Sequence, residues 1–255
     1  MTRMTRMTRK KAFLIHLGLS AAIGLAVIAV MLLVWYPPPY FQATGGNDLV
    51  MILVGVDVVL GPLITLIVFN PAKALRLIRL DLTVIAVLQL SALVYGMHYV
   101  AIGRPVYMVF TVDRFDLVLA NDLRDAELAR VTDPRFKDIP WDGPRIIAVK
   151  SPTDPDEQLR VITSAGTGYD LQTFPQYYVP YADLAPEALK KSRPLERLRA
   201  THPEDAAVID AELKKLGRAL ADTSYLPLKG RAHDFSVLLD AKSGAIVGYA
   251  KVSPW

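Results

Sequence analysis

Residues 49–69 read LVMILVGVDVVLGPLITLIVF, an almost unbroken run of aliphatic side chains in a chain of 255 residues. About twenty such residues in a helix cross a hydrocarbon core of about 30 Å. One carboxylate, Asp57, lies inside the run, and Gly61 and Pro62 follow it. Because an acidic side chain at membrane depth is costly, Asp57 requires a partner or a function. The run therefore predicts a membrane-spanning helix that carries a polar site.

Two further apolar runs flank this one, at about 12–36 and 80–100. Each is long enough to cross a bilayer, so three spans are expected. The first run follows Arg9, Lys10 and Lys11, as the apolar part of a secretory signal does. A signal usually has an apolar part of only about 7–15 residues, so an uncleaved anchor is favoured.

Small residues and a proline favour close packing of these spans. Gly18, Ala22 and Ala26 recur at every fourth position and form a face suited to close helix contact. Pro62 is expected to bend the second span or to widen the bundle. Such a bend could form a groove for a guest helix, or it could serve packing within the bundle alone.

The distribution of basic residues predicts the topology. Basic residues precede the first span, and Lys73, Arg76 and Arg79 lie between the second and third spans, whereas residues 37–48 contain neither Lys nor Arg. By the positive-inside rule, residues 1–11 form a basic cytoplasmic tail, and the domain at residues 104–255 lies on the opposite side of the membrane. No structural role is expected for the Met-Thr-Arg repeat at the start of the tail.

Composition excludes several classes of function. Eight Lys or Arg and three acidic residues precede residue 104, which leaves 21 of the 29 basic and 22 of the 25 acidic residues for the remainder. The later part is thus near neutral, which argues against nucleic-acid binding. The chain has no cysteine, which excludes disulfides, thiol catalysis and Cys-ligated metals. His202 and His233 have no metal-ligand spacing, so neither a metal nor a cofactor is expected.

The remainder of the chain is expected to fold as an α+β domain. Residues 106–112 and 145–150 have the β-branched and aromatic composition of strands, and residues 235–252 resemble a β-hairpin. Helices are expected after Asp154 and over 185–217, with interruptions near Pro194 and Pro203. The predicted fold is an α-helical three-span membrane anchor at 12–103 followed by an α+β soluble domain at 104–255.

Four residues are candidates for a site within the membrane: His16, Asp57, Pro62 and Gln89. A rise of 1.5 Å per residue places Asp57 and Gln89 at a similar depth, roughly 12 Å below the outer surface of the hydrocarbon. His16 enters from the other side and is separated from Asp57 by about 10 Å, too far for a direct pair. Two readings remain open: a neutral Asp57 hydrogen-bonded to Gln89, or an Asp57 that receives a polar group from another protein's helix. A proton or ion path is a third reading, which the lack of further intramembrane acids disfavours.

Two motifs of the soluble domain allow more than one interpretation. Asp113 and Asp116 could form an acid–base or metal-binding pair, or Arg114 could bind them in a surface salt bridge. The loop at 169–181 contains aromatic side chains that could form a recognition surface or could pack in the core. These side chains are Phe174, Tyr177, Tyr178 and Tyr181.

Several motifs together resemble the type IV pilin accessory protein family, the TfpX/TfpZ or FimB-like proteins. The most specific blocks are GVDVVLGPL at 55–63, RPVY at 104–107, VDRF at 112–115 and FPQYYVPY at 174–181. The resemblance covers nearly the whole chain from Lys10, and the Met-Thr-Arg repeat departs from it. It implies an inner-membrane protein that assists the major pilin before or during its assembly into pili, and it implies no catalytic residues.

The leading hypothesis is therefore a chaperone that contacts type IV major pilin and membrane lipids. The expected membrane contacts are Asp57, Pro62, His16 and Gln89. The expected contacts of the domain are Arg104, Tyr107, Asp113, Arg114, Tyr177, Tyr178 and Tyr181. Two alternatives remain: a pilin-modifying membrane enzyme, for example a sugar transferase that uses Asp113 and Asp116, and a periplasmic sensor, for which the chain offers no cytoplasmic output domain.

Overall fold

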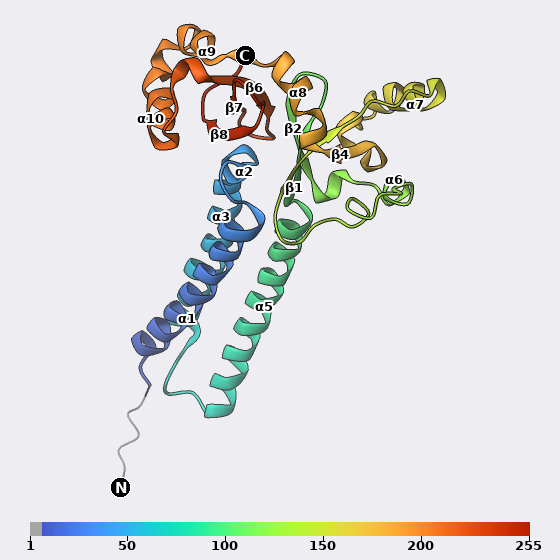
Figure 1. Cartoon of the computed structure of the whole chain (residues 1–255). Coiled ribbons are helices and arrows are strands. Elements are labelled where there is room, and N and C mark those ends of the chain that lie inside the picture. The colour runs from blue at the N-terminus through green and yellow to red at the C-terminus, as the bar shows by residue number, and fades with distance from the viewer. Residues whose placement is uncertain (1–6) are drawn as a thin grey trace. The chain divides into compact units, whose positions relative to one another are not determined.

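The computed structural model describes residues 7–255, so the first six residues of the expected basic tail lie outside the described part. The chain divides into two compact units (Figure 1). One unit, the anchor, contains the described residues up to Val34 together with Gly46–Ile102. The other, the head, contains Trp35–Gly45 and Gly103–Trp255.

Three long apolar helices form the anchor. They run over Arg9–Trp35, Gly46–Val68 and Leu75–Ile102, which are 27, 23 and 28 residues long. At 1.5 Å per residue each is longer than the roughly 30 Å of a hydrocarbon core. The predicted three-span anchor is thereby confirmed. The segments within these helices are α1 Arg9–Val30, η1 Met31–Trp35, α3 Gly46–Val54, η2 Gly55–Leu60, α4 Gly61–Val68 and α5 Leu75–Ile102.

Pro62 changes the pitch of the second helix instead of breaking it. Proline has no N–H, so Pro62 cannot donate to the carbonyl of Val58, four residues earlier. The preceding residue, Gly61, donates instead to the carbonyl of Val56, five residues earlier. This wider bonding pattern is that of the π-helical segment η2, which contains Asp57.

The predicted small-residue face of the first helix does not make its contacts within the anchor. Gly18, Ala22 and Ala26 are exposed, whereas Ser20 and Gly24 are buried. The buried residues are displaced by two positions from the expected ones, which corresponds to a rotation of about 200° around the helix axis. The packed face therefore lies almost opposite the expected face. Gly24 faces the second helix so closely that a Cβ atom there would lie 3.2 Å from Cγ2 of Val58.

The head is built on a mixed sheet of eight strands with the order β4-β3-β1-β2-β6-β7-β8 and β5 paired to β6. Strands β1 and β3 are parallel, as are β2 and β6, and the other pairs are antiparallel. The predicted α+β class and the β7–β8 hairpin are confirmed, whereas β2, β4, β5 and β6 were not predicted. Strand β4 lies in the segment expected to be a loop, and β5 in the region expected to be helical. The strands are β1 Pro105–Phe110, β2 Phe115–Leu119, β3 Arg145–Val149, β4 Tyr178–Pro180, β5 Arg193–Pro194, β6 Thr223–Lys229, β7 Phe235–Asp240 and β8 Ile246–Ala250.

Sequence chemistry accounts for several helix ends of the head, although α8 begins four residues before the expected position. Asp154 caps α7 by accepting hydrogen bonds from the backbone N–H groups of Asp156 and Glu157. The helical region expected at 185–217 is divided near Pro194 and Pro203, as predicted, and Gly217 ends it with a left-handed φ of 64°. The helices are α6 Asp125–Leu128, α7 Pro155–Ala165, α8 Tyr181–Lys191, α9 Leu195–Thr201 and α10 Ala206–Leu216.

The segment between the first two anchor helices belongs to the head. It contains the short helix α2, Tyr40–Ala43, whose end residues are buried in the same core cluster as strands of the sheet. The carbonyl of Ala43 accepts hydrogen bonds from the backbone N–H groups of Arg231 at 2.8 Å and Ala232 at 2.9 Å. The segment was expected to be a loop of the anchor, but its buried aromatic residue and these hydrogen bonds make it part of the head.

A buried carboxylate ties α6, α7 and the 175–177 turn together. Glu127 is 4% exposed and accepts from both Nη atoms of Arg160, at 2.8 and 2.9 Å, and from the Gln176 amide at 2.9 Å. Arg124 donates a further bond at 3.3 Å. Burial acts to raise the pKa of Glu127, but the bonds from Arg160 and Gln176 outweigh it and hold the pKa below its usual value. Glu127 is therefore charged at neutral pH and fully paired.

Replacement of Glu127 by Ala is expected to destabilise the head by about 1–3 kcal/mol, because it leaves Arg160 and Gln176 without their acceptor. Thermal unfolding of the detergent-solubilised chain, followed by near-ultraviolet circular dichroism, measures the loss. Glu187→Ala is the matched control, since Glu187 forms an exposed pair with Lys190 that is worth little. Equal effects of the two substitutions would contradict this account.

Candidate functional site

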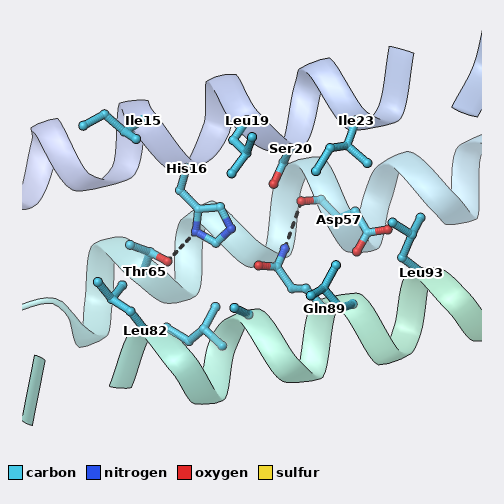
Figure 2. Close-up of a pocket in the computed structure, with 13 residues that line it drawn as sticks. Ile15, His16, Leu19, Ser20, Ile23, Asp57, Thr65, Leu82, Gln89 and Leu93 are labelled. Carbon is cyan, nitrogen blue, oxygen red and sulfur yellow. Dashed lines mark hydrogen bonds between the residues drawn. The ribbon is translucent and has the colours of Figure 1, made fainter. Parts of the chain in front are cut away.

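A cleft of about 310 Å³ opens between the three helices of the anchor. Figure 2 shows side chains of all three helices lining it. Its walls are mostly aliphatic, and five polar side chains interrupt them. These five are His16 and Ser20 from α1, Asp57 from η2, Thr65 from α4 and Gln89 from α5.

Asp57 is the most constrained polar group of the cleft. The residue is 8% exposed, and its Oδ1 atom has no hydrogen-bond partner among the described residues. A buried polar atom without a partner costs free energy, and the cost is largest where water is excluded. The cleft thus presents an unsatisfied acceptor oxygen inside an apolar wall.

Gln89 supports the helix that carries Asp57 but does not bind its carboxyl group. Its Nε2 atom donates to the backbone carbonyl of Asp57 at 3.2 Å (Figure 2). The expectation of a bond between Gln89 and the Asp57 side chain is therefore corrected. The reason is the π-helical pitch of η2, which leaves backbone carbonyls without their usual helical donors and so offers one to Gln89.

Gly61 makes room for this bond. A Cβ atom at Gly61 would lie 1.8 Å from Nε2 and 2.4 Å from Cδ of Gln89. Both atoms are well inside van der Waals contact, so a larger residue at this position would force the Gln89 amide to move away from its bond. Gly61 and Pro62 therefore act together: the proline produces the π-turn, and the glycine admits the amide that satisfies it.

His16 bonds a different residue of the second helix. Its Nδ1 atom lies 2.6 Å from Oγ1 of Thr65. Thr65 is eight residues from Asp57, a distance of roughly 12 Å along a helix, which agrees with the separation of His16 and Asp57 expected from their depths. His16 therefore enters the same cleft as Asp57, at another level of it.

Sequence reasoning missed Ser20 and Thr65. Ser20 lies one helical turn after His16, and Thr65 lies about two turns after Asp57, so each shares a face with a residue that was identified. A Ser or Thr in an apolar run does not by itself indicate a site, because its hydroxyl can bond a carbonyl of its own helix. The i, i+4 spacing from His16 was the available signal for Ser20.

The cleft does not have the ligands of a metal site. It contains one carboxylate and one imidazole, and the imidazole is bonded to Thr65. Over residues 7–255, the His and acidic side chains close enough to share an ion are His202, Glu204 and Asp205, which lie in the head. Hydrogen bonding to a partner is therefore the chemistry that the cleft supports.

Three of the expected contact residues of the head are buried. Tyr107 and Tyr178 pack edge to face in the core, with ring centroids 5.2 Å apart. The Tyr178 hydroxyl donates to the carbonyl of Gln172 at 2.5 Å. Arg104 is also buried and donates to the carbonyl of Pro140 at 3.0 Å. Of the two interpretations of the aromatic loop, packing in the core therefore applies to Tyr178 and to Phe174, which is fully buried.

Tyr177 and Tyr181 are partly buried and hydrogen-bonded. The Tyr177 hydroxyl donates to the carboxylate of Glu157 and is the main reason why the pKa of Glu157 falls to about 2. The Tyr181 hydroxyl donates to the carbonyl of Gly244 at 2.6 Å, and burial raises its pKa to about 12. Both side chains thus brace the loop that contains them.

Asp113 and Asp116 do not form an acid–base pair. Asp116 is buried and accepts from Nε of Arg114 at 3.1 Å and from the Thr111 hydroxyl at 2.9 Å. Asp113 is exposed. Together with Arg114 it lines a second cleft of about 370 Å³, which also contains Val112 and Ile162. The salt bridge expected at Arg114 is therefore made to Asp116, and Asp113 is left accessible at the cleft.

Replacement of Gly61 by Ala is expected to displace Gln89 and to destabilise the anchor by about 1–3 kcal/mol, because the new methyl group occupies the position of the amide. Gly96→Ala is the control, since a Cβ atom at Gly96 meets nothing within 4 Å. Thermal unfolding in detergent, followed by the far-ultraviolet signal of the helices, compares the two. A Gly61→Ala variant as stable as Gly96→Ala would show that the Gln89 bond contributes nothing.

The chain matches known proteins over most of its length. A family model described as "Fimbrial assembly protein FimB" matches residues 5–45. Two fimbrial assembly proteins of Dichelobacter nodosus, of serogroups E1 and I, are each 31% identical over 231 residues, which cover 89% of this chain and 88% of theirs. A third, of serogroups C1 and C2, is 37% identical over 114 residues, which cover 45% of this chain and 87% of that protein. No solved structure matches. The chain belongs to the FimB-like family of fimbrial assembly proteins, as its motifs predicted.

Proposed function

We propose that this protein assists the assembly of type IV pili by binding the transmembrane helix of the major pilin in the cleft of its anchor. The observation that carries the proposal is the buried, unpartnered Oδ1 of Asp57 in an otherwise apolar cleft. The names of the relatives, fimbrial assembly proteins, support the assembly role.

A helix is the occupant that best fits the cleft. Helices satisfy their own backbone groups, so they bring only side chains to a wall of aliphatic groups. A guest helix that carries one hydrogen-bond donor would pair with Asp57 and pack elsewhere on Ile15, Leu19 and Leu90, which line the cleft. Interhelical hydrogen bonds of this kind contribute on the order of 1 kcal/mol in membranes. That contribution suits a helper that must later release its client.

The head offers an accessible contact region for the part of a pilin outside the membrane. The second cleft combines the exposed carboxylate of Asp113 with the exposed apolar side chains of Val112 and Ile162. Apolar groups beside a few polar ones are typical of protein-binding surfaces. Of the head residues expected to contact pilin, Asp113 and Arg114 are the pair at this cleft.

We further propose that the N-terminus lies in the cytoplasm and the head in the periplasm of a bacterial inner membrane. Lys73 lies between the second and third helices, and Arg76 and Arg79 lie near the start of the third. Such residues favour the cytoplasmic side. Residues 35–45 belong to the head, which supports one common side for this segment and the C-terminal domain.

A photo-crosslinking residue at Ile15 or Leu90 is expected to capture major pilin in cells. Asp57→Leu is expected to lower the yield roughly three- to tenfold, because it removes a hydrogen bond worth about 1 kcal/mol. Asp57→Asn keeps an acceptor oxygen and is expected to retain most of the yield. Immunoblotting for pilin measures each product.

Leu25 and Ile67 provide the matched control positions, since both are exposed on the anchor and neither lines the cleft. Equal capture from these positions and from Ile15 would show that contact is not specific to the cleft. Undiminished capture by Asp57→Leu would remove Asp57 from the site.

The topology can be tested by thiol labelling, because the chain has no cysteine of its own. In spheroplasts, a membrane-impermeant maleimide is expected to label Glu187→Cys on the head and to leave Ala72→Cys unlabelled until lysis. Both positions are exposed, so a difference reports the side of the membrane. Labelling of Ala72→Cys alone would reverse the proposed orientation.

A further inference from the structure

Two residues of the head lie at the ends of membrane spans in the sequence. Trp35 is the last residue of the first apolar helix, Arg9–Trp35, and Arg104 follows the third, Leu75–Ile102, by two residues. The point at which an apolar helix ends marks the boundary between hydrocarbon and headgroups, where tryptophan is enriched. Side chains in contact with both residues therefore lie close to that boundary.

Trp141 is in contact with both, although it is distant from them in the sequence. Its backbone carbonyl accepts a hydrogen bond from Nε1 of Trp35 at 3.2 Å, and the two rings lie 6.0 Å apart. The guanidinium carbon of Arg104 lies 3.8 Å from the centroid of the Trp141 ring, which is a cation–π geometry. Arg104 also holds the preceding residue through the carbonyl of Pro140, at 3.0 Å.

The ring of Trp141 nevertheless remains largely open. The residue is 62% exposed, although tryptophan side chains are usually well buried. Its position is fixed by the bonds to its backbone and by the stacked arginine, so the exposure does not come from a loose loop. An indole held in this way has an apolar body and a polar N–H, the combination that favours the headgroup region.

We propose that Trp141 inserts into the headgroup region of the bilayer and tethers the head to the membrane surface. The occupant of its exposed face is lipid, because the two residues that hold it are those at which the chain leaves the hydrocarbon. Trp35, Arg104 and Trp141 together form one interfacial cluster. Trp141 was not among the residues identified from the sequence, since it lies in no long apolar run.

Depth-dependent fluorescence quenching tests this proposal on the full chain in phosphatidylcholine–phosphatidylglycerol vesicles. The chain has three tryptophans, so Trp35→Phe with Trp255→Phe leaves Trp141 as the sole tryptophan, which is excited selectively over tyrosine at the red edge of its absorption. Lipids with a spin label near the headgroup are expected to quench it more strongly than lipids labelled near the end of the acyl chain. Its emission maximum is expected to lie to the blue of that of a solvent-exposed tryptophan.

The matched reference is Leu159→Trp in a chain without the native tryptophans. Leu159 is 60% exposed and lies on α7, whose hydrogen-bonded neighbours are α6 and the 175–177 turn. Its emission is expected to be quenched by aqueous iodide and not by either lipid. The same iodide quenching of Trp141, with no quenching by lipid, would overturn the proposal.

A second measurement keeps Trp35 and its bond in place. A nitroxide on Trp141→Cys is expected to collide more often with oxygen, relative to a water-soluble nickel chelate, than a nitroxide on Leu159→Cys does. Oxygen concentrates in the bilayer and the chelate in water, so this ratio reports depth. Equal ratios at the two positions would contradict insertion. This result would not depend on Trp35→Phe, which removes the bond to the Trp141 carbonyl in the fluorescence experiment.

Discussion

Polar groups inside hydrocarbon must find partners within the protein, and this constraint governs the anchor. Pro62 cannot donate a backbone hydrogen bond, so the helix before it adopts a π-turn. The Gln89 amide satisfies the carbonyl of Asp57, and Gly61 provides the space for it. One oxygen of the Asp57 carboxylate stays without a partner over the described residues. A single missing N–H thus accounts for the local geometry around the polar site.

The head follows a different rule, because its polar groups can be paired on the protein or hydrated. Glu127 is buried but has three side-chain partners, so it stabilises the packing of α6 and α7 instead of forming a reactive site. Asp116 is satisfied in the same way by Arg114 and Thr111. These saturated carboxylates contrast with Asp57. The difference explains why the proposed function rests on the anchor.

Membership in the FimB-like family was predictable because its motifs combine spacing with unusual residue types, such as the acid and the glycine–proline pair of residues 55–63. The positions of single side chains were less predictable. Tyr107, Tyr178 and Arg104 combine a large side chain with a polar group, and all three are buried. Arg104 and Tyr178 bond backbone carbonyls, and Tyr107 packs against the ring of Tyr178. Their chemistry alone does not distinguish a core role from a binding role.

The three spans, the α+β class of the head and the family follow from the order of the residues, because each depends on hydrophobic period, segment length and motif, which are local properties. Which side chains contact one another depends on the folded structure. The bond of Gln89 to a backbone carbonyl, the pairing of His16 with Thr65 and the stacking of Trp141 on Arg104 join residues far apart in the chain. Such contacts depend on how helices rotate and how strands are ordered, and both are set by packing of the whole unit, which no local pattern encodes.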